Sequence, residues 1–222
     1  SSALYGGSQN LLHYTLRRFG IETSFVPTGD LDAWRAAIRP NTRLLFGETV
    51  GNPGLDVLDI PSVSAIAHEA RVPLLVDSTF TTPWLMKPFD HGADIVYHSA
   101  TKFLSGHGTV IGGVLVDGGS FDWEASGRFE ELTGPYDGFQ GMVFTEESTV
   151  GAFLLRARRE GLRDFGACMS PHTAWLILQG IETLPLRMQQ HMRNTERVVE
   201  FLVSQAFVAR VGHPMLETHP SH

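Results

Sequence analysis

The chain is poor in cysteine, with only Cys168 among its 222 residues. An internal disulfide is therefore impossible, which fits a reducing compartment, and we expect the protein to be cytoplasmic. Cys168 follows two small residues and precedes an expected helix start. We interpret it as a small buried hydrophobic residue rather than as a nucleophile.

Long apolar runs and clusters of basic residues are also missing. No stretch of about 18 uninterrupted apolar residues occurs, so the sequence predicts no membrane-spanning helix. The formal charge is -7, from 24 acidic and 17 basic residues, and the basic residues form no long run. Binding to nucleic acid or to a membrane surface therefore has no support, and we expect small-molecule partners.

Metal and hydrolase motifs are absent as well. Ten histidines are present, but none has a ligand spacing, and His68-Glu69 lacks the second histidine of a zinc-protease motif. We interpret the histidines as structural or solvent-facing and expect no metal site. A Ser/His/Asp triad stays open from composition alone, although no Gly-x-Ser-x-Gly elbow supports one.

What the sequence does contain is an alternation of apolar runs and amphipathic segments. Expected strands cover residues 24–26, 44–48, 72–77, 93–97 and 111–116, and expected helices cover 8–19, 30–38 and 59–70. Because strands that alternate with helices form parallel sheets, we predict an α/β fold: a mostly parallel sheet with helices on both faces.

The second half of the chain has a different pattern. Residues 117–144 show no clear period and predict a loop-like insertion, followed by a helix from 145 to about 162. Ser170-Pro171 opens a long helical pattern, which Pro185 interrupts and which continues to about 203. A further strand is expected at 207–211. We therefore divide the chain into a large domain, residues 1–185, and the start of a small C-terminal α+β domain, residues 186–222.

The residues with the strongest chemical signal lie around Lys102. This lysine follows the apolar run 93–97, and the hydroxyl residues Ser99 and Thr101 precede it. The neighbouring run 72–77 ends in Asp77. Taken alone, Lys102 is more often a solvated lysine, and Asp77 is more often a helix cap or a loop residue. Together they offer what pyridoxal phosphate (PLP) needs: an amine for a Schiff base, an acid for the ring nitrogen and hydroxyls for the phosphate.

With these residues in view, the chain resembles the Cys/Met-metabolism family of PLP-dependent enzymes, which have fold type I. The matching segments are LYGG at 4–7, ETVGNP at 48–53, DSTF at 77–80, SATKFLSGHG at 99–108, SPH at 170–172 and GIETL at 180–184. Within the family it is most similar to the O-acetylhomoserine sulfhydrylases, through TVIGG at 109–113, the insertion with FDW at 121–123, and LRDFG at 162–166. Members are longer at both ends, so we expect this sequence to be the interior of a longer chain.

The resemblance implies roles for seven residues. Lys102 would form the Schiff base with PLP and transfer protons at the substrate, and Asp77 would pair with the ring nitrogen. The other five would complete the cofactor site: phosphate binding by Ser99 and Thr101, stacking and proton transfer by Tyr5, and contacts to cofactor or substrate carboxylate by Asn52 and Thr79.

The implied reaction is a γ-replacement in methionine and cysteine biosynthesis. O-acetyl-L-homoserine and sulfide would give L-homocysteine and acetate, in a homotetramer built as a dimer of dimers. Two alternatives of the same family stay open, a methionine γ-lyase and a cystathionine γ-synthase. A third alternative is a non-catalytic fragment or homologue that acts as a binding or assembly unit.

Overall fold

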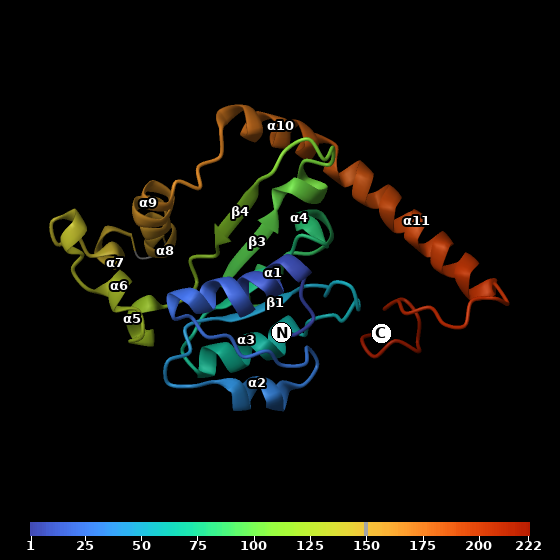
Figure 1. The fold of residues 1–222 in the computed structure, drawn as a ribbon, viewed down its shortest axis with the longest axis horizontal. Coiled ribbons are helices and arrows are strands. Elements are labelled where there is room, and N and C mark those ends of the chain that lie inside the picture. The colour runs from blue at the N-terminus through green and yellow to red at the C-terminus, as the bar shows by residue number, and fades with distance from the viewer. Residues whose placement is uncertain (149–150) are drawn as a thin grey trace.

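The computed structural model describes residues 1–148 and 151–222, and its centre is a four-stranded sheet in the order β1-β2-β3-β4 (Figure 1). Three strands are parallel, β1 (Leu45–Glu48), β2 (Leu74–Asp77) and β3 (Ile95–Ser99). The fourth strand, β4 (Gly113–Asp117), is antiparallel to β3. The predicted α/β fold with a mostly parallel sheet is therefore confirmed.

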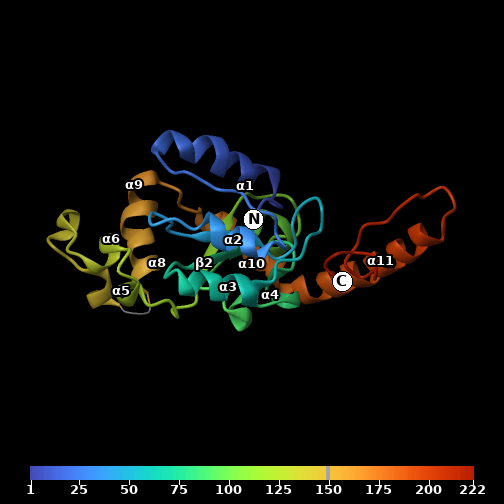
Figure 2. The same ribbon diagram turned by 90° about the horizontal axis from the view of Figure 1, so that it is seen from below.

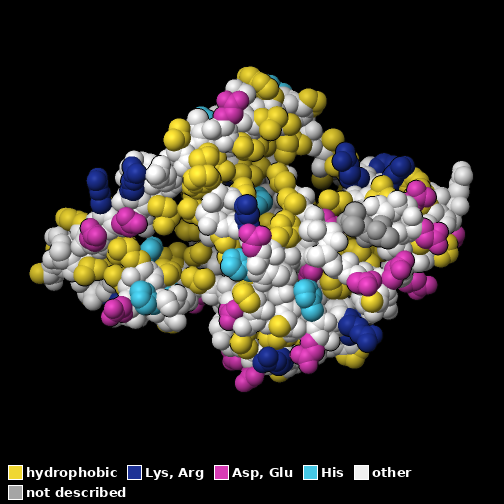
Figure 3. Space-filling model, turned by 180° about the vertical axis from the view of Figure 1, so that it is seen from behind, with side chains coloured by type: hydrophobic (Ala, Val, Ile, Leu, Met, Phe, Trp, Pro, Cys, Tyr) yellow, Lys and Arg dark blue, Asp and Glu magenta, His cyan; other side chains and the backbone are white. Residues whose placement is uncertain are grey.

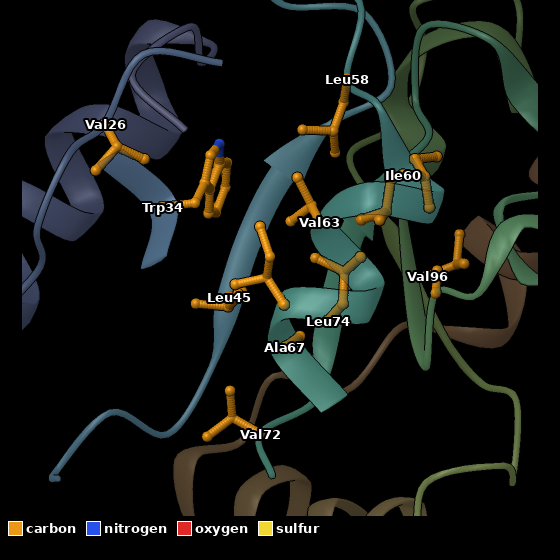
Figure 4. Close-up of a cluster of buried hydrophobic side chains, with 13 residues drawn as sticks. Val26, Trp34, Leu45, Leu58, Ile60, Val63, Ala67, Val72, Leu74 and Val96 are labelled. Atoms are coloured by element: carbon orange, nitrogen blue, oxygen red, sulfur yellow. The ribbon is translucent and has the colours of Figure 1, made fainter. Parts of the chain in front are cut away.

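Two helices cover one face of this sheet. They are α2 (Leu31–Ala37) and α3 (Ile60–Glu69), and each begins where an aspartate side chain, Asp30 or Asp59, accepts a backbone N–H of the first turn. Alternate residues of the strands point toward them and form a buried cluster (Figure 4). The cluster contains Val26, Trp34, Leu45, Leu58, Ile60, Val63, Ile66, Ala67, Val72, Leu74, Val76, Ala93 and Val96.

The opposite face is partly covered by the segment that we expected to be a loop-like insertion. That expectation is wrong, because the segment forms short helices: α5 (Trp123–Ser126), α6 (Glu130–Thr133), a turn at Asp137–Phe139 and α7 (Phe144–Glu147). Aromatic residues hold them against Ile95 of the sheet; the buried ones are Trp123, Phe129 and Phe144. Helices this short leave no repeating apolar pattern, so no helical period can be detected in this part of the sequence.

The helix expected from 145 to 162 is divided in the structure. Helix α8 (Ala152–Arg156) continues through the turns Ala157–Leu162 into α9 (Arg163–Phe165). Residues 149–150 of the expected helix lie outside the described part. Cys168, which follows α9, is exposed, so our interpretation of it as a buried residue is wrong.

The N-terminal helical segment lies along the outside of the molecule. It runs through α1 (Gly6–Asn10), Leu11–Thr15 and Leu16–Phe19, and ends at Gly20, whose φ of 79° suits glycine. The strand expected at 24–26 does not form. The backbone of these residues bonds to the N-terminal segment instead: the Ser2 N–H donates to the Val26 carbonyl.

Two long helices complete the chain. Helix α10 (Pro171–Glu182) is capped by the Ser170 side chain, and α11 (Leu184–Ser204) begins after a break at Thr183, with Pro185 in its first turn. Helix α11 projects away from the sheet in both views (Figures 1 and 2). It runs across the boundary we expected between residues 185 and 186, so the division into two domains stays a prediction.

Two shorter elements, α4 (Thr82–Leu85) and the turn Pro88–His91, link β2 to β3.

The strand expected at 207–211 is not formed, and residues 205–222 are irregular. A strand needs a hydrogen-bonded neighbour, and residues 207–211 pair with none of the strands β1 to β4. Many apolar side chains remain exposed on the last two helices, among them Trp175, Leu178, Leu186 and Phe201. Figure 3 shows hydrophobic side chains gathered at the end of the molecule that α10 forms. Of the helices in the described residues, none is long and apolar enough to cross a membrane.

Candidate active site

A cavity of about 760 Å³ opens where the carboxyl ends of β1, β2 and β3 meet. This is the edge at which open α/β sheets bind ligands, and the size is typical of a small-molecule site. All seven residues that the sequence singled out line it: Tyr5, Asn52, Asp77, Thr79, Ser99, Thr101 and Lys102. The structure therefore brings together side chains separated by nearly a hundred positions in the chain.

Three titratable side chains form a row across the sheet at the base of this cavity. Glu48, Asp77 and Tyr97 are paired in register on β1, β2 and β3, so strand alternation places all three on the same face. Ser99 lies two residues beyond Tyr97 and points to the same side. Burial raises the pKa of Tyr97, and the neighbouring Asp77 raises it further.

Asp77 is buried, with 8% of its surface exposed, and is held by the loop that follows β2. Its Oδ1 accepts the backbone N–H of Thr79 at 2.8 Å, and the Thr79 side chain also bonds to it. The Thr79 hydroxyl oxygen accepts the backbone N–H of Ser99 at 2.7 Å, so Thr79 links the ends of β2 and β3. Burial raises the pKa of Asp77 despite these bonds.

Lys102 follows β3 in the helical turn Ala100–Leu104, where its own backbone departs from helical geometry. Its side chain is exposed at the cavity, and its Nζ lies 5.8 Å from the centre of the Tyr5 ring. This distance is within the range of a cation–π contact. The amine and the tyrosine ring therefore face each other across the part of the cavity nearest to solvent.

Thr101 reaches the cavity but already has partners. Its hydroxyl donates to the Gly112 carbonyl at 3.2 Å and accepts the Gly112 N–H at 3.1 Å. To donate to a bound phosphate, Thr101 would have to release the Gly112 carbonyl. Ser99 lines the same part of the site without such a pair of bonds to Gly112.

Glu48 lines the cavity and was missed as a site residue, although the ETVGNP motif contains it. It is 7% exposed, and its Oε1 accepts the Tyr5 backbone N–H at 2.6 Å. The backbone N–H of Asn52 also donates to it. Burial raises the pKa of Glu48 to about 7, although these two N–H groups favour the charged form. Its place at a strand end beside Asp77 was the signal that could have identified it.

Three more lining residues come from the helical side of the cavity. Phe103 makes edge-on contacts with Phe80 and His191, and Arg187 lies near His191 on α11. Arg187 donates to the Gly180 carbonyl at 2.7 Å and to the Thr183 hydroxyl at 3.1 Å. Phe103 belongs to the motif around Lys102, but no local motif marks Arg187 or His191, because α11 reaches the cavity only through the tertiary fold.

The cavity fits PLP on its own chemistry. Asp77 is a buried carboxylate, and within residues 1–148 and 151–222 it makes no salt bridge. A ring nitrogen that carries a proton would supply the missing cation. At the other side, Lys102 offers a primary amine, and hydroxyls and Arg187 suit an anionic phosphate. In the same described residues, no group of three or more His, Cys, Asp or Glu side chains could hold a metal ion.

Comparisons with known proteins agree with this chemistry. The family model described as "Cys/Met metabolism PLP-dependent enzyme" matches residues 1–222. The chain is 49% identical to an O-acetyl-L-homoserine sulfhydrylase of Leptospira meyeri and 46% identical to a homocysteine synthase of Schizosaccharomyces pombe. Each match covers 100% of this chain and 52% of the relative, so the chain spans about half the length of these relatives.

Solved structures give the same result. One is a putative O-acetylhomoserine (thiol)-lyase of Campylobacter jejuni, determined with N'-pyridoxyl-lysine-5'-monophosphate, with a TM-score of 0.95 and 35% identity over 99% of this chain and 55% of that one. Another is an O-acetylhomoserine sulfhydrylase of Wolinella succinogenes, with a TM-score of 0.87 and 36% identity over 99% of this chain and 60% of that one. The chain thus belongs to the Cys/Met-metabolism family of PLP-dependent enzymes.

Proposed function

We propose that the protein catalyses a PLP-dependent γ-replacement, in which O-acetyl-L-homoserine and sulfide give L-homocysteine and acetate. The observation that carries the proposal is a single cavity with an amine, Lys102, on one side and a buried carboxylate, Asp77, at its base. The names of the relatives above support this reaction over others of the family.

The bound cofactor would supply an aldehyde for the substrate amine and a ring that accepts electron density when the substrate loses a proton. Asp77 would stabilise the protonated ring nitrogen, because a buried carboxylate gains most from a cation placed beside it. Ser99 and Thr101, with the backbone near Lys102, would bind the phosphate. Tyr5 would stack on the ring, and Asn52 and Thr79 would contact the cofactor or the substrate carboxylate.

Lys102 would have two roles in this reaction: to attach the cofactor before substrate arrives and to move protons on the substrate afterwards. A single well-placed acid–base group contributes roughly 10²–10⁴-fold to a rate. In the net reaction the bond between the γ carbon and the acetate oxygen breaks, a carbon–sulfur bond forms, and acetate leaves with its electron pair. Hydrogen sulfide supplies the new sulfur and the proton, so the atoms balance.

We also propose that the protein works in the cytoplasm as a homotetramer. The single, exposed cysteine is compatible with a reducing compartment. Exposed apolar side chains on the N-terminal helix and on α10 and α11 offer surface for contacts between subunits; they include Tyr14, Phe19, Trp175 and Leu186.

The reaction can be tested with the purified protein and PLP. We expect O-acetyl-L-homoserine with sulfide to release homocysteine and acetate in equal amounts. Methionine supplied alone should give no methanethiol and no α-ketobutyrate. Methanethiol release without added sulfide would replace the sulfhydrylase by a lyase, and replacement of sulfide by cysteine as the preferred substrate would favour cystathionine synthesis.

Borohydride reduction with PLP tests the site independently of the substrate. The chain has two lysines, Lys87 and Lys102, so peptide mapping has a simple outcome. We expect the pyridoxyl group on the peptide that contains Lys102. Equal labelling of both lysines, or no labelling, would refute the proposed attachment.

A further inference from the structure

Glu48 occupies a position that the proposed roles leave unused. It is the last residue of β1, lies in register with Asp77 of β2, and is almost fully buried. A buried carboxylate needs hydrogen-bond donors, and here both are backbone N–H groups from other segments of the chain. One belongs to Tyr5 in the N-terminal segment and the other to Asn52 in the loop after β1. Glu48 therefore joins two segments that both line the cavity.

The bond to Tyr5 matters because this residue itself is not packed into the core, although the preceding Leu4 is buried. The Tyr5 side chain is 49% exposed, so core packing does not hold its ring. Its backbone is held by the bond from its N–H to Glu48, at 2.6 Å, and by the bond from the Gln9 N–H to its carbonyl. A short hydrogen bond to a carboxylate is about twice as strong as one between neutral groups.

From this geometry we propose that Glu48 is a positioning residue, which holds the backbone of Tyr5 so that the tyrosine ring faces the Lys102 amine. The inference rests on the proposed function, in which Tyr5 stacks on the cofactor. The Glu48 carboxylate acts on the cofactor through Tyr5, and not as a second charge beside the ring nitrogen.

Two conservative variants of Glu48 distinguish whether the position of its carboxylate or its negative charge matters. Glu48→Asp keeps the charge but shortens the side chain by one methylene, so its carboxylate retracts from the Tyr5 N–H. Glu48→Gln loses the charge but keeps the reach, and its amide oxygen still accepts the N–H. Glu69→Gln, at an exposed position at the end of α3, is the matched control.

The first measurement is hydrogen exchange of the N-terminal peptide in the protein without added cofactor. We expect exchange of the Tyr5 amide to be about tenfold faster in Glu48→Asp than in the wild type, as loss of one charge-assisted bond implies. Glu48→Gln and Glu69→Gln should stay within about threefold of the wild type. Equal exchange in Glu48→Asp and the wild type would overturn the proposal.

The second measurement is PLP affinity, by equilibrium titration, in the same variants and in the Tyr5→Ala background. We expect Glu48→Asp to weaken binding by about tenfold and Glu48→Gln to weaken it much less. In Tyr5→Ala, the Glu48→Asp change should cost no more than about twofold, because the residue through which it acts is gone. A larger loss in Glu48→Gln than in Glu48→Asp would show that charge matters and would overturn the positioning role.

The two readouts keep this inference separate from the proposed function. If the wild-type protein bound no PLP, the proposed function would fail. The exchange of the Tyr5 amide would still decide whether Glu48 holds that segment.

Discussion

The two sides of the cavity differ in charge. The strand side carries two buried carboxylates, Glu48 and Asp77, and burial raises the pKa of both. The side formed by the loop after β3 and by α11 carries Lys102, Arg187 and His191. Burial lowers the pKa of Arg187, although its guanidinium stays cationic. A ligand that suits both sides has a cationic end and an anionic end, as a protonated pyridine with a phosphate group does.

The two sides also differ in how they are held. The strand side is fixed by the parallel ladder, with register from Leu45–Leu74 through Glu48–Asp77, above a core that excludes water. The loop side depends on a close approach between α10 and the segment after Lys102. At Gly180, a β-carbon would collide with the carbonyl oxygen of Ser105. The acids are thus placed by the sheet, whereas the amine is placed by one helix packed on one loop.

Removal of the Lys102 amine should have the largest effect on activity. We expect Lys102→Ala to lower the γ-replacement rate by at least about 10²–10⁴-fold, because in the proposed function this one group would both attach the cofactor and move protons. Steady-state assays with O-acetylhomoserine and sulfide measure this. Lys87→Ala, at an exposed position outside the cavity, is the control and should keep its activity. Activity of Lys102→Ala close to that of the wild type would contradict the assignment.

Removal of the charge of Asp77 should have the next largest effect. We expect Asp77→Asn to bind PLP about 10- to 150-fold more weakly, the loss expected for one hydrogen bond to a charged group. Fluorescence titration of the protein with PLP gives the dissociation constants. Asp90→Asn, in an exposed turn, should bind as the wild type does.

A pH series sharpens this test. The Asp77 pKa is raised by burial, and only the ionised form can pair with a protonated ring nitrogen. The affinity of the wild type should therefore fall as the pH drops through the pKa of Asp77. The Asp77→Asn variant should lack this part of the profile; a parallel fall in both would assign the titration to another group.

Much of the strand side could be predicted from sequence. Runs of apolar residues that end in Asp77 and just before Ser99 indicate strands, and parallel strands bring their carboxyl ends to one edge. That rule is enough to predict that Asp77, Ser99 and Lys102 meet. It also applies to Glu48, which ends the first strand and could have been identified in the same way; only its bond to the Tyr5 backbone has no sequence signature.

The loop side could not be predicted in the same way. Arg187 and His191 lie on α11, which the sequence indicated only as the continuation of a helical pattern after Pro185, and its path over the cavity depends on Gly180. The expected strands at 24–26 and 207–211 failed because a short apolar run becomes a strand only beside a hydrogen-bonding neighbour. The short helices between α5 and α7 are stabilised by aromatic contacts such as Phe121 with Trp123, which no period reveals.

The dependence of the loop side on α10 gives the third prediction. Gly180→Ala should destabilise the protein by about 1–3 kcal/mol, since overpacking forces α10 away from Ser105. At about 2–4 °C per kcal/mol, the melting temperature should fall by several degrees. Gly161→Ala is the control, because a β-carbon there meets nothing within 4 Å. Equal melting temperatures for Gly180→Ala and the control would mean that the contact is not tight.

The smallest predicted effect concerns the acids of the strand side and the stability of the protein as pH changes. The pKa of Glu48 is about 7 in the folded chain and near 4.5 in the unfolded one. Between these values the folded chain binds more protons than the unfolded chain, so the free energy of unfolding falls as pH rises. Because water in the cavity screens the group, we expect the loss between pH 5 and pH 8 to be about 1–2 kcal/mol.

Comparison with Glu48→Gln isolates this contribution. Chemical denaturation at pH 5 and pH 8 gives the free energies. From pH 5 to pH 8 the wild type should lose stability relative to Glu48→Gln, while Glu69→Gln should follow the wild type. Parallel profiles for all three would show that Glu48 is already ionised below pH 5, and the strand side would then carry two full negative charges at neutral pH.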